Sequence, residues 1–224
     1  NALEEVVKTI SHAIRKGQIV MDICSVKEAP VKIMHQYIKG GLILGTHPAF
    51  GPGSNGLKHK AFILTPTNNE EQKFAEEFKK WLEKEEARVF VMSPKHHDEL
   101  MSVVLGFPHF LGVVACDTLL EKAYFPETKK VAGTTYRMLF TLAEATALEN
   151  PELFATLQLN LPEIDSLEKL FMEKAQEWLT LIRQKDPAAI AAKMEQLRAK
   201  LMKTSTDYTR SYEIMYKMLE STDS

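Results

Sequence analysis

The chain has 224 residues, of which 45% are hydrophobic and 26% are charged, so a disordered or fibrous chain is excluded. Its formal net charge of -2 lacks the basic excess with which nucleic-acid binders neutralise phosphates, so we expect no nucleic-acid partner. Cys24 and Cys116 are too few for a disulfide framework or a zinc cluster, and both lie in apolar runs. We therefore expect buried thiols, no metal site and a reducing, cytoplasmic location.

The longest stretch without a charged residue is Leu100–Cys116, which contains Ser102, Pro108 and His109. A membrane span needs about 20 predominantly apolar residues, so we interpret this stretch as a buried core helix and expect no membrane partner. The chain opens with a charged amphipathic helix and shows no signal peptide.

The first half of the chain alternates helices and strands. Apolar spacing predicts helices over 2–15, over 27–38 and after the capping pair Asn68 and Glu71, with strands over 19–23, 42–44, 61–64 and 89–92. Continuous apolar strands between helices indicate a mostly parallel sheet that is covered on both faces. A doubly wound sheet normally begins with a strand and has more than four strands, so we expect this chain to begin partway through such a domain.

The second half predicts helices alone. Ser93 is a plausible N-cap, and Pro94 is tolerated as a first helical residue. Two apolar stripes have helical spacing, and they consist of Leu167, Leu170, Phe171, Ala175, Trp178 and Leu179, and of Ile190, Met194, Leu197 and Leu201. The predicted fold is therefore a partial Rossmann-like α/β domain over 1–94, followed by an all-helical domain over 95–224.

Two polar side chains follow neighbouring strands of the predicted sheet. Ser25 comes after strand 19–23, and His47 comes after strand 42–44. Ligands of open parallel sheets bind beyond the carboxyl ends of the strands, so these side chains are candidates for one site. The alternative is that Ser25 caps the next helix and that His47 is an ordinary turn residue.

The segment Gly51–Gly56 matches the G-x-G-x-x-G pattern of dinucleotide-binding proteins literally. That pattern holds a pyrophosphate only between a strand and a helix, whereas this segment leads into a strand. Pro52 also removes one backbone N–H from the supposed cradle. We therefore predict a loop near the site rather than a phosphate cradle.

Three further histidines lie in the second half. His96 and His97 are adjacent on a helix and point about 100° apart, so one metal ion is not expected between them; His97 is predicted to be a surface or capping residue. His109 sits in an apolar run directly after Pro108. A buried imidazole needs a hydrogen-bond partner, which is either a ligand or a backbone carbonyl of the core.

Three segments of the chain resemble the prephenate dehydrogenase (TyrA-type) family, in particular its archaeal branch. The first segment is Met21–Pro30, with the motif Ser-Val-Lys, and the second is Gly45–Gly53, with the motif Thr-His-Pro. The third comprises the pairs His97-Asp98 and Pro108-His109. The resemblance implies a Rossmann domain followed by a helical dimerisation domain. It also implies oxidative decarboxylation of prephenate to 4-hydroxyphenylpyruvate with NAD or NADP, in a homodimer.

The resemblance also implies roles for single residues. His47 would bind the ring hydroxyl of the substrate and take up its proton, and Ser25 would orient His47 and touch both substrate and nicotinamide. Thr46 and Pro48 would join Ser25 in contacting the cofactor. His109 would line the substrate pocket.

The chain departs from the family pattern at two places. The strand–GxGxxG–helix opening of the family is absent, and the arginine that would hold a substrate carboxylate is replaced by Ala145, next to Glu144. Arg137 is the remaining candidate for that contact, or else a surface ion-pair residue. These departures leave two alternatives open, which are a related dehydrogenase with another substrate and a non-catalytic dimerising remnant.

Overall fold

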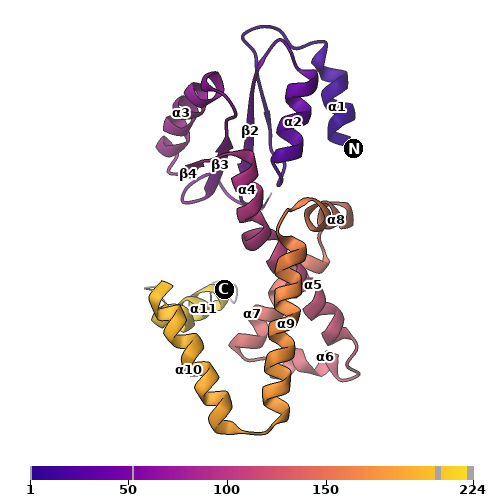
Figure 1. Ribbon diagram of the computed structural model, residues 1–224, viewed down its shortest axis with the longest axis vertical. Helices are drawn as coiled ribbons and strands as arrows, with labels where there is room; N and C mark the ends of the chain where they lie inside the picture. Colours follow the sequence, from indigo (N-terminus) through magenta and orange to yellow (C-terminus); the bar gives the residue numbers. More distant parts are fainter. Residues whose placement is uncertain (1, 52, 205–207, 221–224) are drawn as a thin grey trace. The chain divides into compact units, whose positions relative to one another are not determined.

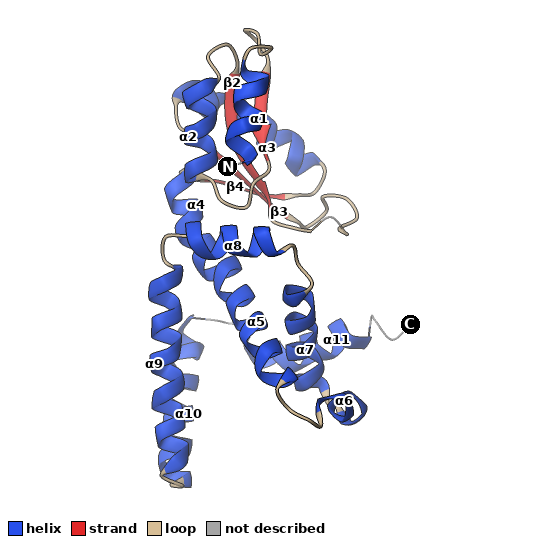
Figure 2. Ribbon diagram, turned by 90° about the vertical axis from the view of Figure 1, so that its right-hand side faces the viewer, coloured by secondary structure: helices blue, strands red, loops and turns tan. Residues whose placement is uncertain are grey.

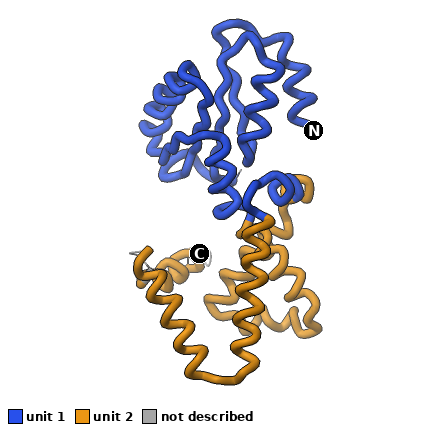
Figure 3. The backbone as a smooth tube through the Cα atoms, viewed as in Figure 1, with its two compact units in different colours: residues 1–106, 155–164 blue, residues 107–154, 165–224 orange. Residues whose placement is uncertain are grey.

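The computed structural model describes residues 2–51, 53–204 and 208–220. The chain folds into two compact units, of which the first comprises 1–106 and 155–164 and the second comprises 107–154 and 165–224 (Figure 3). The predicted change from α/β to all-helical structure is present, because strands within the described residues are confined to 19–91 (Figure 2).

The first unit is built around a four-stranded sheet in the order β1-β2-β3-β4. The strands are β1 (Ile19–Asp22), β2 (Leu42–Pro48), β3 (Ala61–Thr65) and β4 (Arg88–Val91). The helices of this unit are α1 (Ala2–Ser11), α2 (Glu28–Tyr37), α3 (Asn69–Lys84) and α4 (Pro94–Met101), together with the second half of α8 (Pro151–Asn160).

The sheet is mixed rather than wholly parallel. β1 pairs with β2 and β3 pairs with β4 in parallel, but β2 and β3 are antiparallel. The reason is the connection over 49–60, whose described residues form no helix, whereas a parallel pair needs a crossover that is usually helical. The segment Gly51–Gly56 lies in this connection and leads into β3, as predicted, while Pro52 lies outside the described residues.

Both faces of the sheet are covered, as the alternation of elements predicts. Ile43 points to a cluster with Val7, Val31 and Met34 from α1 and α2, whereas Leu44 packs with residues of β3 and α3. Successive side chains of a strand point to opposite faces, which explains why neighbours in β2 join different clusters. Figure 1 shows α1 and α2 on one side of β2 and α3 on the other.

Gly45 allows α2 to lie close to β2. A Cβ atom at this position would collide with the Thr65 hydroxyl and with a methyl group of Val31. The glycine therefore brings the beginning of α2 against the part of β2 that carries Thr46 and His47.

The predicted helix caps of this unit are confirmed. Asn68 accepts hydrogen bonds from the amides of Glu70 and Glu71, and Glu71 accepts one from the Asn68 side chain in return. The Ser93 hydroxyl accepts from the amide of His96, with Pro94 as the first residue of α4.

The second unit contains α5 (Phe107–Leu120), α6 (Phe125–Thr128), α7 (Thr134–Ala147), α9 (Ile164–Arg183), α10 (Pro187–Thr204) and α11 (Ser211–Glu220). α5 packs along α7 where Gly112 meets Thr146, and a Cβ atom at Gly112 would overlap the threonine hydroxyl. Many large apolar side chains of the last three helices are exposed, and they include Leu170, Met172, Leu179, Ile182, Met194, Leu197, Leu201, Tyr212 and Met218.

The stretch 100–116 is helical, but the prediction of a buried core helix is wrong for the single chain. Val103, Val104 and Val114 are exposed, and Gly112 alone is buried within α5. A π-helical turn over Ser102–Gly106 precedes Pro108, which cannot donate a backbone hydrogen bond. Among the described residues, Pro94–Leu120 is the one helical stretch that is long and apolar enough to cross a membrane, by length and composition only.

Candidate functional site

His47 lies inside β2 rather than in a turn after it. β2 extends to Pro48 because β3 pairs with its second half, with His47 opposite Ile63. The His47 side chain is buried, and its Nδ1 atom lies 2.8 Å from Nε2 of His97 in α4. The interpretation of His47 as an ordinary turn residue is therefore wrong.

A row of hydrogen bonds continues from His97 to Asp98. Nδ1 of His97 lies 2.7 Å from Oδ1 of Asp98, and both side chains are buried. The prediction of His97 as a surface or capping residue is wrong, because α4 turns this residue toward β2. The adjacent His96 is exposed and lies beside Glu99, so the two histidines do not share a ligand position.

Asp98 also holds the beginning of α2. Its Oδ1 accepts a hydrogen bond from the Lys27 amide at 2.7 Å, and its Oδ2 accepts from the Glu28 amide at 2.9 Å. These amides would otherwise lack partners at the N-terminus of the helix. Because Lys27 is the N-cap residue and Asp98 satisfies the first amides, the interpretation of Ser25 as the cap of this helix is not supported.

Ser25 stands two residues before the first of these amides. It is half-buried in the segment that connects β1 to α2. In the parallel pair, Asp22 is opposite Gly45, so the chain after β1 and the Thr46–His47 part of β2 lie at the same edge of the sheet. The structure thus places Ser25 and His47 at one sheet edge, as the order of the strands predicts.

A buried ion pair lies beneath this edge. The Lys27 ammonium contacts the Asp22 carboxylate and donates to the Thr46 carbonyl at 2.6 Å, and the Lys27 side chain is fully buried. Asp22 also accepts from the amides of Cys24 and Thr46, at 3.0 and 3.3 Å. The ion pair therefore joins β1, β2 and the first residue before α2.

Burial dominates the acid–base behaviour of this region. It lowers the pKa of His47 from 6.5 to about 4, with His97 and the Lys27 ammonium acting in the same direction and Asp98 opposing them. Burial also lowers the pKa of Lys27, against the attraction of Asp22. Burial and the Asp22 carboxylate raise the pKa of Cys24 to about 11. At neutral pH, His47 is therefore an uncharged imidazole.

Thr46 and Pro48, both predicted to contact the cofactor, differ in their surroundings. Thr46 is buried, and its hydroxyl, amide and carbonyl all bind Asp22 or Lys27, so its contacts hold β1 and β2 together. Pro48 is half-buried at the end of β2, opposite Phe62.

His109 and Arg137 lie in the second unit and do not come together there. Nε2 of His109 lies 3.2 Å from Oε2 of Glu149, just after the end of α7. Arg137 is ten residues before the last residue of α7, which corresponds to about 15 Å of helix. It lines a separate cavity of about 420 Å³ with Lys129, Tyr136 and Glu144.

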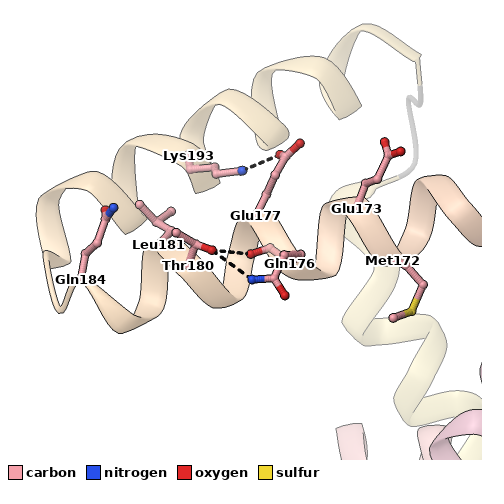
Figure 4. A pocket seen from close by; sticks show the side chains of 8 residues that line it. All are labelled: Met172, Glu173, Gln176, Glu177, Thr180, Leu181, Gln184 and Lys193. Carbon is pink, nitrogen blue, oxygen red and sulfur yellow. Dashed lines mark hydrogen bonds and ion pairs between the residues drawn. The ribbon is translucent and has the colours of Figure 1, made fainter.

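The described residues contain no metal-binding cluster. No group of three or more His, Cys, Asp or Glu side chains there could hold a metal ion. A pocket of about 790 Å³ lies between α9 and α10, where Glu177 pairs with Lys193 (Figure 4). It contains none of the predicted site residues.

Comparisons with known proteins agree with this arrangement. Residues 1–91 match the sequence model of the prephenate dehydrogenase nucleotide-binding domain, and residues 93–196 match that of the prephenate dehydrogenase dimerization domain. A probable arogenate/prephenate dehydrogenase of Methanocaldococcus jannaschii is 34% identical over 191 residues, which cover 83% of this chain and 42% of the relative. The T-protein of Enterobacter agglomerans is 25% identical, over 78% of this chain and 46% of its own length.

Solved structures share the fold. Prephenate dehydrogenase from A. aeolicus, in complex with hydroxyphenyl propionate and NAD+, superimposes with a TM-score of 0.71 and 23% identity, over 91% of this chain and 73% of the other. Synechocystis arogenate dehydrogenase superimposes with a TM-score of 0.66 and 17% identity, over 91% and 74%. The chain thus spans less than half the length of the first two curated relatives and about three quarters of the solved chains.

Proposed function

Because the chain belongs to the prephenate dehydrogenase family, we propose that it forms part of an NAD(P)-dependent enzyme that oxidatively decarboxylates prephenate to 4-hydroxyphenylpyruvate, in tyrosine biosynthesis. The observation that supports this most directly is His47. It is a buried, uncharged imidazole at the sheet edge where ligands of such sheets bind. Its Nδ1 atom is hydrogen-bonded to His97, which begins a row of buried side chains.

The described residues include groups suited to contact the nicotinamide end of the dinucleotide. Ser25 and His47 offer a hydroxyl and an imidazole at the sheet edge, which suits contact with a nicotinamide and a small polar substrate. No glycine-rich strand–turn–helix cradle for a pyrophosphate lies within the described residues, since the five residues that connect β1 to α2 include no glycine. We propose that residues 1–94 are the C-terminal part of the dinucleotide-binding domain and that residues 95–224 serve the substrate and the dimer.

The chemistry of His47 follows from its free ring nitrogen. Bound NAD(P)+ supplies a hydride acceptor for the carbon that carries the substrate hydroxyl. Nε2 of His47 accepts the hydroxyl proton as the C–O bond becomes a carbonyl, and Ser25 orients the hydroxyl. The ring carboxylate then leaves as CO₂, its bonding electrons make the ring aromatic, and the proton returns from His47 to the phenolic oxygen. General-base assistance of this kind contributes about 10²–10⁴-fold to the rate.

The test is spectrophotometric formation of NADH or NADPH from prephenate by the full-length gene product. His47→Asn keeps a side-chain amide where Nδ1 lies and removes the proton acceptor, so kcat should fall by about 10²–10⁴-fold with little change in KM. His12→Asn, at an exposed position of the first unit, is the matched control and should leave kcat unchanged. Wild-type activity in the His47→Asn variant would overturn this assignment.

A second candidate substrate is arogenate, in which an amino group replaces the keto group of the prephenate side chain. The arginine position of the family reads Ala145, and Glu149 places a partly buried carboxylate beside His109. The ammonium group of arogenate would pair with this carboxylate, whereas the keto group of prephenate, which has no proton to donate, would not. A higher kcat/KM for arogenate than for prephenate, reversed by Glu149→Gln, would select this candidate.

We also propose that the enzyme is a cytoplasmic homodimer joined through its helical half. The exposed apolar side chains of α9 and α10 and the exposed valines before and within α5 would be buried against a second copy. Light scattering should give twice the chain mass at micromolar concentration. A monomer in solution, or recovery of the protein in the membrane fraction, would contradict this proposal.

A further inference from the structure

The Asp98 carboxylate determines how protons are distributed along the row that ends at His47. It accepts hydrogen bonds from the amides of Lys27 and Glu28, and its Oδ1 atom lies 2.7 Å from Nδ1 of His97. An ionised carboxylate can only accept hydrogen bonds, so Nδ1 of His97 carries a proton. In the neutral ring, Nε2 of His97 is then an acceptor. Nδ1 of His47, 2.8 Å away, must therefore be the donor.

This order of donors and acceptors is compatible with one tautomer of His47. With its proton on Nδ1, the neutral ring has a lone pair on Nε2, which is the atom that must accept the substrate proton. The opposite order would require a doubly protonated His97 that donates to both neighbours, and it would place a proton on Nε2 of His47. The Lys27 ammonium already lies in this buried region, and a second buried cation is costly because burial disfavours charge.

Asp98 also connects the two halves of the sheet edge. Its contacts with the Lys27 and Glu28 amides fix the chain two residues after Ser25, while its contact with His97 fixes His47 in β2. All three side chains of the row are buried, with exposed fractions of 5% or less. One carboxylate thus sets the distance between the hydroxyl and the imidazole of the proposed site.

We propose that Asp98 and His97 are positioning residues that hold His47 as the Nδ1–H tautomer, with Nε2 free to accept a proton, and that Asp98 fixes the Ser25 segment at the same edge. The role of this tautomer in catalysis rests on the proposed function. The tautomer of His47 itself is measurable without substrate or cofactor.

The first experiment is long-range ¹H–¹⁵N NMR of the 224-residue chain labelled at histidine, with His47 assigned by the spectrum of His47→Asn. The expected result is a protonated Nδ1 and an unprotonated Nε2 at neutral pH. Asp98→Asn should abolish this preference, because an asparagine can donate to His97 as well as accept from it. A proton on Nε2 of wild-type His47, or an unchanged tautomer in Asp98→Asn, would overturn the proposal.

The second experiment measures kinetics in the full-length gene product. Asp98→Asn and His97→Gln should each lower kcat by about 10²–10⁴-fold with a much smaller change in KM, as expected when a general base is held in the wrong tautomer. His96→Gln, at the exposed neighbour, is the matched control and should leave kcat unchanged. Wild-type kcat in both variants would refute the positioning role.

The two readouts separate the possible failures. If the wild-type protein oxidises neither prephenate nor arogenate but the spectrum shows Nδ1–H at His47, the proposed function fails and the tautomer assignment stands. If Asp98→Asn does not fold, His97→Gln still tests the row, because it leaves the contacts of Asp98 with α2 in place.

Discussion

The burial of His47 should make the stability of the first unit depend on pH in a specific way. Its pKa is 6.5 when exposed and about 4 in the folded protein, so the unfolded chain binds the proton more tightly. A group with a lowered pKa contributes its full stability above 6.5, and that contribution is lost as the pH falls from 6.5 toward 4. At about 1.4 kcal/mol per pH unit, the loss is about 2 kcal/mol at pH 5 and about 3 kcal/mol at pH 4.

The measurement is urea unfolding at pH 7, 6 and 5, in a Trp178→Phe background. The remaining tryptophan, Trp81 in α3, then reports on the first unit through its fluorescence. The same series is recorded for His47→Asn, which cannot take up the proton. Between pH 7 and pH 5 the parent should lose about 2 kcal/mol more than this variant.

Equal losses in the two chains would refute the reasoning, since they would mean that His47 is not held in its neutral form by burial. A folded pKa lower than about 4 would leave the loss between pH 7 and pH 5 unchanged and extend it to lower pH, because the unfolded chain takes up the proton near pH 6.5. The choice of pH 5 as the lower limit matters because most carboxylates titrate below it.

Three further perturbations test the surroundings of the site. Lys27→Met should cost about 3–5 kcal/mol in urea unfolding, because it leaves the buried Asp22 carboxylate without its partner, and Asp22→Asn in the same chain should restore part of the loss. Gly45→Ala should lower the unfolding free energy by about 1–3 kcal/mol, a cost that Thr65→Ala should reduce in thermal unfolding if the collision with the hydroxyl is its cause. Cys24 should react with iodoacetamide at pH 8 about 100-fold more slowly in the folded protein than in the urea-unfolded chain. The reason is that folding raises the pKa of its thiol to about 11 and so lowers its thiolate fraction. Equal rates would contradict the burial of this thiol.

The fold was largely predictable from local patterns. The spacing of apolar residues and the capping residues Asn68 and Ser93 locate the helices and strands of the first unit, because these signals are confined to a few consecutive residues. The antiparallel pairing of β2 with β3 was not predicted. It depends on which strands meet in space, and the length of β2 followed from that pairing rather than from its own sequence.

The candidate site was predictable only in part. The order of the strands places Ser25 and His47 at one sheet edge, but the partners of His47 come from α4, fifty residues later in the chain. A histidine next to an aspartate has no local signature that distinguishes a buried hydrogen-bonded pair from an exposed one. The exposed valines before and within α5 were missed for a related reason, since an apolar run does not reveal whether its own chain or a second copy covers it.

The hydrogen bonds between Asp98 and the beginning of α2 join a side chain to the main chain, so the two partners differ in how far they depend on residue identity. On one side they depend on a particular side chain, but on the other they use only the main chain at positions 27 and 28. Glu28, whose side chain is exposed, can therefore be replaced by almost any residue other than proline without loss of the contact. A single codon change at position 98 removes it. Mutational tolerance should accordingly be wide at position 28 and narrow at position 98, although both residues meet in the same hydrogen bond.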